Sequence, residues 1–376
     1  MNASRYRLFR MAMRRRESSS KPGLVWRAAG AKSSLRVSLT MTISTTESTP
    51  PPTPSDRRPS PRRPWRLVCL AAIGVAFIGA ASFYRYFWYA RPVGSGPAGE
   101  VVTAERFEND YETWSDRKVL LVGIGDSVTE GYGATTAAKG YFNRLVANPP
   151  DEFPDMKGKC LSRVLPNLIH RNLALSGSTS QECLDILVPK LGVQEEETFG
   201  VVVMTTGGND IIHNYGRTPP REGAMYGAAL EEARPWIDNF RTRLDAIFDQ
   251  ISARFPGGCH FFMANIYDPT DGEGDVENAG LPAWPDGLKI IAAYNAIIAQ
   301  AAEKRKNVSL VNMHDGFLGH GIHCLKFWRR HYDARDPHYW YWDNLEDPND
   351  RGYDALRRLF LNEMARVLPP QLEDGD

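Results

Sequence analysis

Residues 118–133 read KVLLVGIGDSVTEGYG, and this stretch decides the fold. Its first half is mostly apolar, which predicts a buried strand, and that composition ends at Gly125-Asp126-Ser127. A helix starting here would place Ser127 at a strand-to-helix turn. Free backbone N–H groups and the positive end of the helix dipole favour negative charge at such a turn. The turn therefore suits a nucleophile, although a serine that only caps the helix fits the same pattern.

Apolar runs alternate with amphipathic segments along the rest of the chain. We expect strands at 121–125, 172–177, 200–207, 260–267 and 308–314. We expect helices at 231–255, 288–305 and 350–368. This alternation predicts an α/β fold, a three-layer α/β/α sandwich with a mostly parallel five-stranded sheet. Ser127, Gly177 and Asn209 each follow a predicted strand, so they would meet at the carboxyl edge of the sheet.

The N-terminal part of the 376-residue chain differs in composition from the rest. Residues 1–65 are rich in Arg, Ser, Thr and Pro, so we expect a disordered, basic tail. The uncharged run LVCLAAIGVAFIGAASFY at 67–84 has about 18 residues, which is close to the minimum length for crossing a bilayer. We therefore predict a transmembrane signal anchor at 66–89, a linker at 90–115 and the main domain at 116–370.

The charges that flank the apolar run predict its orientation. Arginines cluster at 57–66 before the run, and aromatic residues follow it at 84–89. The positive-inside rule then leaves the N-terminus in the cytoplasm and places the main domain on the extracytoplasmic side of a single-pass protein. A cleaved signal peptide is the alternative. Because this topology accounts for the arginines, we expect no nucleic-acid partner.

Three further residue groups leave alternatives open. Export would allow disulfides between Cys160 and Cys183 and between Cys259 and Cys324, although the sequence permits other pairings equally, with four buried thiols as the alternative. The acidic segment 268–277 could bind calcium, but we favour a solvated loop and expect no metal. Six aromatic residues could form a substrate platform or simply pack the loops. They are Trp284, Phe327, Trp328, Tyr339, Trp340 and Trp342.

Three short blocks carry a family resemblance. Gly125-Asp126-Ser127, the NLALSG block at 172–177 and Gly207-Gly208-Asn209-Asp210 together resemble the SGNH, or GDSL-type, serine hydrolase superfamily over roughly 116–370. The resemblance implies a flavodoxin-like SGNH hydrolase fold and ester cleavage through an acyl-enzyme on Ser127. It implies an oxyanion hole made by the N–H groups of Ser127 and Gly177 and by the Asn209 side chain. It also implies a small-molecule, lipid or glycan ester as substrate and no organic cofactor. We expect Asp126 and Asp210 to orient loops.

A fourth block departs from the family pattern. The family places a general-base His in an Asp-x-x-His loop before the last helix, but this chain has Asn344-Leu-Glu-Asp347 there. A carboxylate with a pKa near its ordinary value, about 4, is a poor base at neutral pH.

Three hypotheses for the base follow from this departure. In the first, the base is His338, oriented by Asp336 or Asp333. In the second, it is His314, His320 or His323. In the third, Asp347 is a weak base or the domain is a non-catalytic ligand-binding one. Acyl or acetyl transfer to a glycan is a further alternative to hydrolysis.

Overall fold

The structure, a computed structural model, describes residues 64–102 and 113–373, so nearly all of the predicted tail lies outside the described residues. Its strands form one five-stranded sheet in which every neighbouring pair is parallel. They are β1 (Lys118–Gly125), β2 (Leu168–Asn172), β3 (Thr198–Thr205), β4 (Cys259–Ala264) and β5 (Val308–Val311). The strand order is β2-β1-β3-β4-β5, the doubly wound order of flavodoxin-like folds, as predicted.

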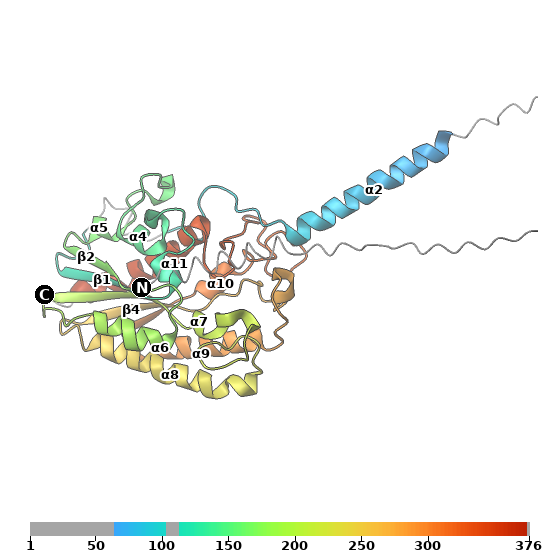
Figure 1. Ribbon diagram of the computed structural model, residues 1–376. Coiled ribbons are helices and arrows are strands. Elements are labelled where there is room, and N and C mark those ends of the chain that lie inside the picture. Colours follow the sequence, from blue (N-terminus) through green and yellow to red (C-terminus); the bar gives the residue numbers. More distant parts are fainter. Residues whose placement is uncertain (1–63, 103–112, 374–376) are drawn as a thin grey trace, which may run out of the picture. The chain divides into compact units, whose positions relative to one another are not determined.

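Helices cover both faces of this sheet. One face carries α4 (Tyr141–Val146), α5 (Leu161–Val164), α10 (Met313–Phe317) and α11 (Asp350–Glu373), and the other carries α8 (Leu230–Ser252) and α9 (Gly287–Lys304). Figure 1 shows α8 and α9 on one side of the strands and α4 and α5 on the other. Val119 and Leu121 belong to the first core and Leu120 and Val122 to the second, because successive strand side chains point to opposite faces. The predicted three-layer sandwich is thereby confirmed.

Short helical turns occupy several loops between these elements. They are η2 (Ala137–Lys139), η3 (Pro154–Met156), the π-helical η4 (Cys183–Leu187), η5 (Val188–Lys190), η6 (His213–Gly216) and η7 (Val276–Ala279).

The second strand was predicted at the wrong place. We expected it at 172–177, but β2 ends at Asn172 and the following residues form a loop. The side chains of β2, which reads LIHRN, are mostly exposed because it is an edge strand, so it lacks the apolar run that marks the buried strands. The loop still follows β1, since the N–H groups of Leu173 and Leu175 donate to the carbonyls of Gly123 and Gly125 at 2.8 and 3.0 Å.

The apolar run predicted as a membrane span forms helix α2 (Pro64–Tyr89). Its segment Trp65–Tyr89 is long and apolar enough to cross a membrane, and none of its most apolar window is buried. The described residues that follow, within the predicted linker, contact the domain. Ala98 N–H donates to Asp354 Oδ2 at 3.0 Å, and Arg351 Nη1 donates to the carbonyls of Ser95 and Gly96, each at 2.9 Å.

Asp354 is the centre of a buried ionic network that joins α11 to α4. It is fully buried and accepts hydrogen bonds from Arg144 Nη1 at 3.0 Å, Arg357 Nε at 2.9 Å and Arg358 Nε at 3.1 Å. Glu152 binds the other side of Arg357 through contacts of 2.6 and 2.7 Å. Arg358 also pairs with the partly exposed Asp155 at 2.6 Å, so the three guanidinium groups share two buried carboxylates and one at the surface.

Replacing Asp354 with Ala should lower the free energy of unfolding by about 3–5 kcal/mol, because it removes the buried carboxylate that three buried guanidinium groups share. Urea denaturation measures this change. Glu231→Ala is the matched control, since Glu231 pairs with Arg234 on an exposed face of α8. Its loss should change the free energy of unfolding by less than about 1 kcal/mol. Equal effects of the two variants would contradict the role assigned to the network.

The structure also resolves the cysteine and acidic-loop alternatives. All five cysteines lie among the described residues and are unpaired, four of them buried, so the two disulfides are absent there. The acidic segment is not a solvated loop, because Asp268 and Asp271 are each only 2% exposed. Asp271 accepts hydrogen bonds from the N–H groups of Gly319, Gly321 and His323 at 2.8–2.9 Å. Asp271 therefore ties two loops together, whereas Asp268 binds Thr270 and Gly272 within its own loop.

Candidate active site

The turn after β1 presents Ser127 at the start of α3 (Ser127–Glu130), as predicted. Gly125 has a φ of 140°, and a Cβ there would lie 1.8 Å from the Thr205 carbonyl, so only glycine allows this approach of β1 to β3. The Asp126 side chain caps α3 by accepting from Val128 N–H at 3.2 Å, and it also accepts from Thr205 Oγ1 at 2.7 Å. The N–H of Ser127 has no partner within the helix because it belongs to the first turn.

Hydrogen bonds bring the other two sequence blocks to this turn. Ser178 Oγ donates to the Gly125 carbonyl at 2.9 Å, and Asn209 Nδ2 donates to the Ser178 carbonyl at 3.1 Å. Asn209 lies on α7 (Gly208–Ile212), and Gly177 adopts a φ of 80° in the loop before α6 (Ser180–Glu182). An amide nitrogen carries two hydrogens, so the bond to Ser178 leaves the second for a substrate.

Asp210 of α7 orients the segment that follows Gly177, as expected. It accepts hydrogen bonds from the N–H and hydroxyl of Ser180 at 2.8 and 2.6 Å and pairs with Arg243 at 3.3 Å. It is 1% exposed, so it acts as a structural carboxylate behind the site.

The side chain that the structure places at the Ser127 hydroxyl is Asp347. Burial raises the pKa of Asp347 to about 6, and hydrogen bonding from Ser127 and Asn344 opposes that rise. Asn344 Nδ2 donates to Asp347 Oδ2 at 2.6 Å, whereas Asp347 Oδ1 has no partner of standard geometry among the described residues. Ser127 and Asp347 are therefore neighbours that form no hydrogen bond of standard geometry.

Asn344 is itself held by the loop that carries Asp347. Its Oδ1 accepts from the N–H groups of Glu346 and Asp347, both at 3.1 Å. These bonds fix which way the amide faces, because the oxygen is committed to N–H groups and the nitrogen must point at the carboxylate. Asn344 thus orients Asp347, and Asp347 is 1% exposed.

The histidines proposed as bases lie elsewhere. His338 Nδ1 pairs with Asp336 Oδ1 at 2.5 Å, and its ring packs against Gly94. His320 stacks on Trp340 with ring centroids 3.5 Å apart, and His323 Nε2 pairs with Asp275 at 2.7 Å. None of the eight histidines, all of them described, lines the cavity beside Ser127. The structure thus pairs His338, His320 and His323 with groups other than Ser127, and the assignment of the base to a histidine stays a prediction.

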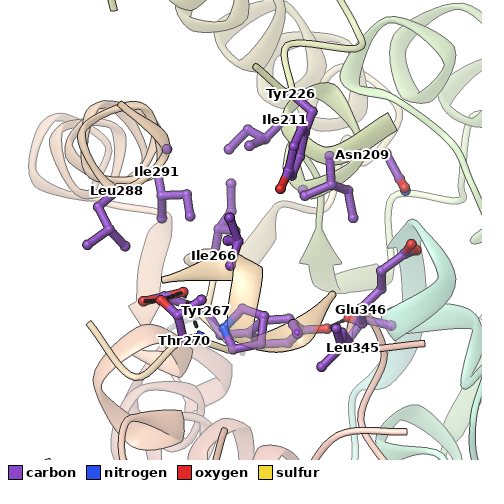
Figure 2. Close-up of a pocket in the computed structure, with 18 of the residues that line it drawn as sticks. Asn209, Ile211, Tyr226, Ile266, Tyr267, Thr270, Leu288, Ile291, Leu345 and Glu346 are labelled. Atoms are coloured by element: carbon purple, nitrogen blue, oxygen red, sulfur yellow. Dashed lines mark hydrogen bonds between the residues drawn. The ribbon is translucent and has the colours of Figure 1, made fainter. Parts of the chain in front are cut away.

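An apolar cavity opens beside Ser127 and Asn209. Its volume is about 1130 Å³, including the space at its open mouth. Figure 2 shows Leu288 and Ile291 of α9 at the opposite end from Asn209 and Glu346. The other apolar lining residues include Ile211, Ile212, Tyr226, Ile266, Val276, Leu281 and Trp284. Of the six aromatic residues expected near the mouth, only Trp284 lines this cavity.

Two further acids share the electrostatics of this site. Burial raises the pKa of Asp126 to about 7 and that of Glu346 to about 9, and the nearby charge of Asp347 raises both. The three buried carboxyls therefore influence one another's ionisation. Glu346 also lines the cavity, and our sequence analysis missed it because only burial distinguishes it from an exposed acid.

The raised pKa of Glu346 predicts a pH-dependent stability effect. Between its ordinary value of 4.5 and about 9, Glu346 holds a proton in the folded chain but not in the unfolded chain. Wild-type stability therefore falls, as far as this group contributes, when the pH rises through that window. Glu346→Gln should raise Tm relative to wild type more at about pH 8 than at about pH 5. An equal shift at both pH values in thermal melts would contradict the assignment.

The comparison with known proteins identifies the family of the chain. Residues 124–355 match the GDSL-like Lipase/Acylhydrolase family, which is more than half of the chain. The chain belongs to this family. Ser127, Gly177, Asn209 and Asp347 all fall within the matched residues, and members of this family are hydrolases of esterase or lipase type. No curated protein matches the sequence.

Several solved structures of this family's kind are similar to the chain. An acetylxylan esterase of Geobacillus stearothermophilus is 18% identical, with a TM-score of 0.41, over 66% of this chain and 94% of its own. An extracellular lipase of Streptomyces rimosus is 17% identical, with a TM-score of 0.40, over 66% and 99%. A phospholipase A1 of Streptomyces albidoflavus is 14% identical, with a TM-score of 0.40, over 66% and 99%. At these identities and TM-scores the likenesses say nothing about the substrate of this chain.

Proposed function

We propose that this chain is a serine carboxylic ester hydrolase in which Asp347 is the general base of Ser127. The observation that supports this proposal is the buried carboxylate of Asp347 at the serine hydroxyl, with its pKa raised to about 6. A base works best when its pKa lies near the working pH, so this shift makes Asp347 a stronger base than an ordinary Asp.

The proton and the acyl group move between named atoms in the proposed reaction. Ser127 Oγ attacks the ester carbonyl carbon while its proton passes to Asp347 Oδ1. Asp347 then returns this proton to the departing alkoxide, which leaves an acyl-enzyme. Water attacks the acyl-enzyme with Asp347 again taking the proton, and Asp347 then gives it to Ser127 Oγ as the carboxylic acid is released. The oxyanion formed in each step is stabilised by the N–H groups of Ser127 and Gly177 and by the Asn209 amide.

The two departures from the family block compensate for each other chemically. In an Asp-x-x-His loop, a carboxylate accepts a hydrogen bond from the base. When the base itself is a carboxylate, as Asp347 is, a second carboxylate at 344 would repel it, whereas an amide can donate. Asn344 Nδ2 makes this donation at 2.6 Å. The pair therefore fits a working replacement better than the loss of catalysis in a ligand-binding domain.

The surroundings of the site favour an ester with an apolar part. The cavity extends from Ser127 to Leu288 and Ile291, so an acyl or alkyl group would be buried there. Helix α2 would hold the domain at a membrane as a single-pass anchor. The arginines at 57–66 favour an extracytoplasmic position for the domain.

The dependence of the rate on pH tests this proposal. Asp347 must be ionised to accept the serine proton, so kcat/KM for a soluble ester should rise with pH through a midpoint near 6 and then level off. Asp347→Asn should remove this rise together with most of the activity. A midpoint unchanged in Asp347→Asn but lost in His338→Ala would assign the base to the histidine instead.

A further inference from the structure

A small apolar surface lies beside the last turn of α2. Phe327 and Trp328 are 59% and 45% exposed, although both side chains are large and apolar. Phe87 of α2 contacts both rings, with centroids 5.9 Å apart in each case. Trp88 lies 6.3 Å from Trp328, and Lys326 Nζ sits 3.9 Å from the centre of the Trp88 ring. We name residues 326–328 the α2-facing loop.

The chain that follows α2 is hydrogen-bonded to the domain, which fixes the position of this loop relative to α2. Tyr89 ends the helix, and soon afterwards the carbonyl of Pro92 accepts from Tyr339 N–H at 2.8 Å. Ser95 and Gly96 bind Arg351 within the next few residues. The chain therefore joins the domain directly after the helix, and the α2-facing loop stays at the level of Phe87 and Trp88.

We propose that the α2-facing loop contacts the interfacial layer of the same lipid bilayer that α2 crosses. Aromatic side chains at the end of a spanning helix lie at the boundary between hydrocarbon and head groups, and Trp and Phe beside them share that depth. Contact with lipid would cover apolar surface that water otherwise solvates at a cost. The inference requires α2 to span a membrane but does not require any catalytic role for Ser127.

The bilayer contact would also position the cavity. The segment that follows α10 continues from Gly319 to the α2-facing loop, and its backbone binds Asp271 at three N–H groups. Ile322 in this segment and Thr270 beside Asp271 both line the cavity. The segment that ends in the α2-facing loop and the loop that carries Asp271 therefore form one wall of the cavity. Contact of the α2-facing loop with lipid would place that wall beside the bilayer.

Fluorescence quenching by brominated lipid tests the contact directly. The full chain is reconstituted into phosphatidylcholine vesicles brominated either close to the head groups or deep in the acyl chains. Subtracting the signal of Trp328→Phe isolates the emission of Trp328 from that of the other tryptophans. We expect Trp328 to be quenched more by the shallow bromines than by the deep ones. Emission from Trp328 that neither lipid quenches would overturn the proposal.

A catalytic comparison separates this proposal from the proposed function. Phe327→Ser/Trp328→Ser should lower the hydrolysis of an ester dispersed in the vesicles by about threefold or more relative to a soluble short ester. The matched control is Ile186→Ser, which changes an exposed apolar residue on η4 and should preserve the ratio. A ratio unchanged in the double variant would overturn the role in positioning the cavity. Quenching of Trp328 in a chain that hydrolyses neither ester would refute the proposed function and leave the contact standing.

Discussion

Ser127→Ala should lower kcat for ester hydrolysis by more than about 10³-fold and abolish covalent labelling by a fluorophosphonate. The variant removes the hydroxyl that the turn after β1 presents to Asp347. Without it no acyl-enzyme forms, and the remaining donors can only polarise the ester carbonyl. Initial rates with a soluble ester measure the loss, and mass spectrometry of the labelled chain locates the modified residue.

A control is needed because Ser127 is buried. Ser115→Ala changes a serine ahead of β1, where Ser115 Oγ accepts from Arg117 N–H at 3.1 Å, far from the carboxyl edge of the sheet. This variant should keep both activity and labelling. Thermal melts of both variants should stay near that of wild type. Labelling that persists in Ser127→Ala at the wild-type rate would mean that another residue is the nucleophile.

Asp347→Asn should lower kcat by about 10²- to 10⁴-fold, the range that a general base usually contributes. The amide keeps the size of the side chain and can still contact Ser127, but it cannot accept the proton. The residual rate should also lose its rise through about pH 6, because the ionising group is gone. Kinetics of wild type and variant between about pH 5 and 8 measure both effects.

A double-mutant cycle at positions 344 and 347 tests whether Asn344 supports Asp347 as the base. Asn344→Asp alone should lower activity, since it sets two carboxylates at the 2.6 Å contact that an amide now makes. The same change should raise activity in an Asp347→His background, because it completes the Asp-x-x-His block of the family. A change of sign of this kind shows that the two positions act together. Additive effects would contradict the compensation that we propose.

The outline of the fold could be predicted from the sequence, and the comparison with the structure shows which parts could not. Apolar patterns predict the strand at 118–125, which is buried on both faces. They also predict the helices at 230–252 and 287–304, each of which buries one side. The edge strand β2 escaped the same reasoning, since its exposed side chains need not be apolar. The sequence alone also missed the burial of Asp271, which depends on N–H groups about 50 residues away.

The base illustrates a different limit. From the sequence, a histidine is the better guess because its ordinary pKa lies near neutral, and Asp347 looks like a lost residue. What makes Asp347 suitable is burial together with the amide of Asn344, and both depend on how the loop before α11 folds. The proposed nucleophile and oxyanion donors were easier to select, since Ser127, Gly177 and Asn209 occur in blocks whose spacing places them after strands.

The rate of fluorophosphonate labelling as a function of pH tests the pairing of Ser127 with Asp347 most directly, because it reads nucleophile activation without depending on the natural ester. We predict that labelling of wild type and of His338→Ala rises with the same midpoint near pH 6. We predict that Asp347→Asn labels about 10²-fold more slowly and with no such midpoint. Wild-type labelling kinetics in Asp347→Asn would contradict the account.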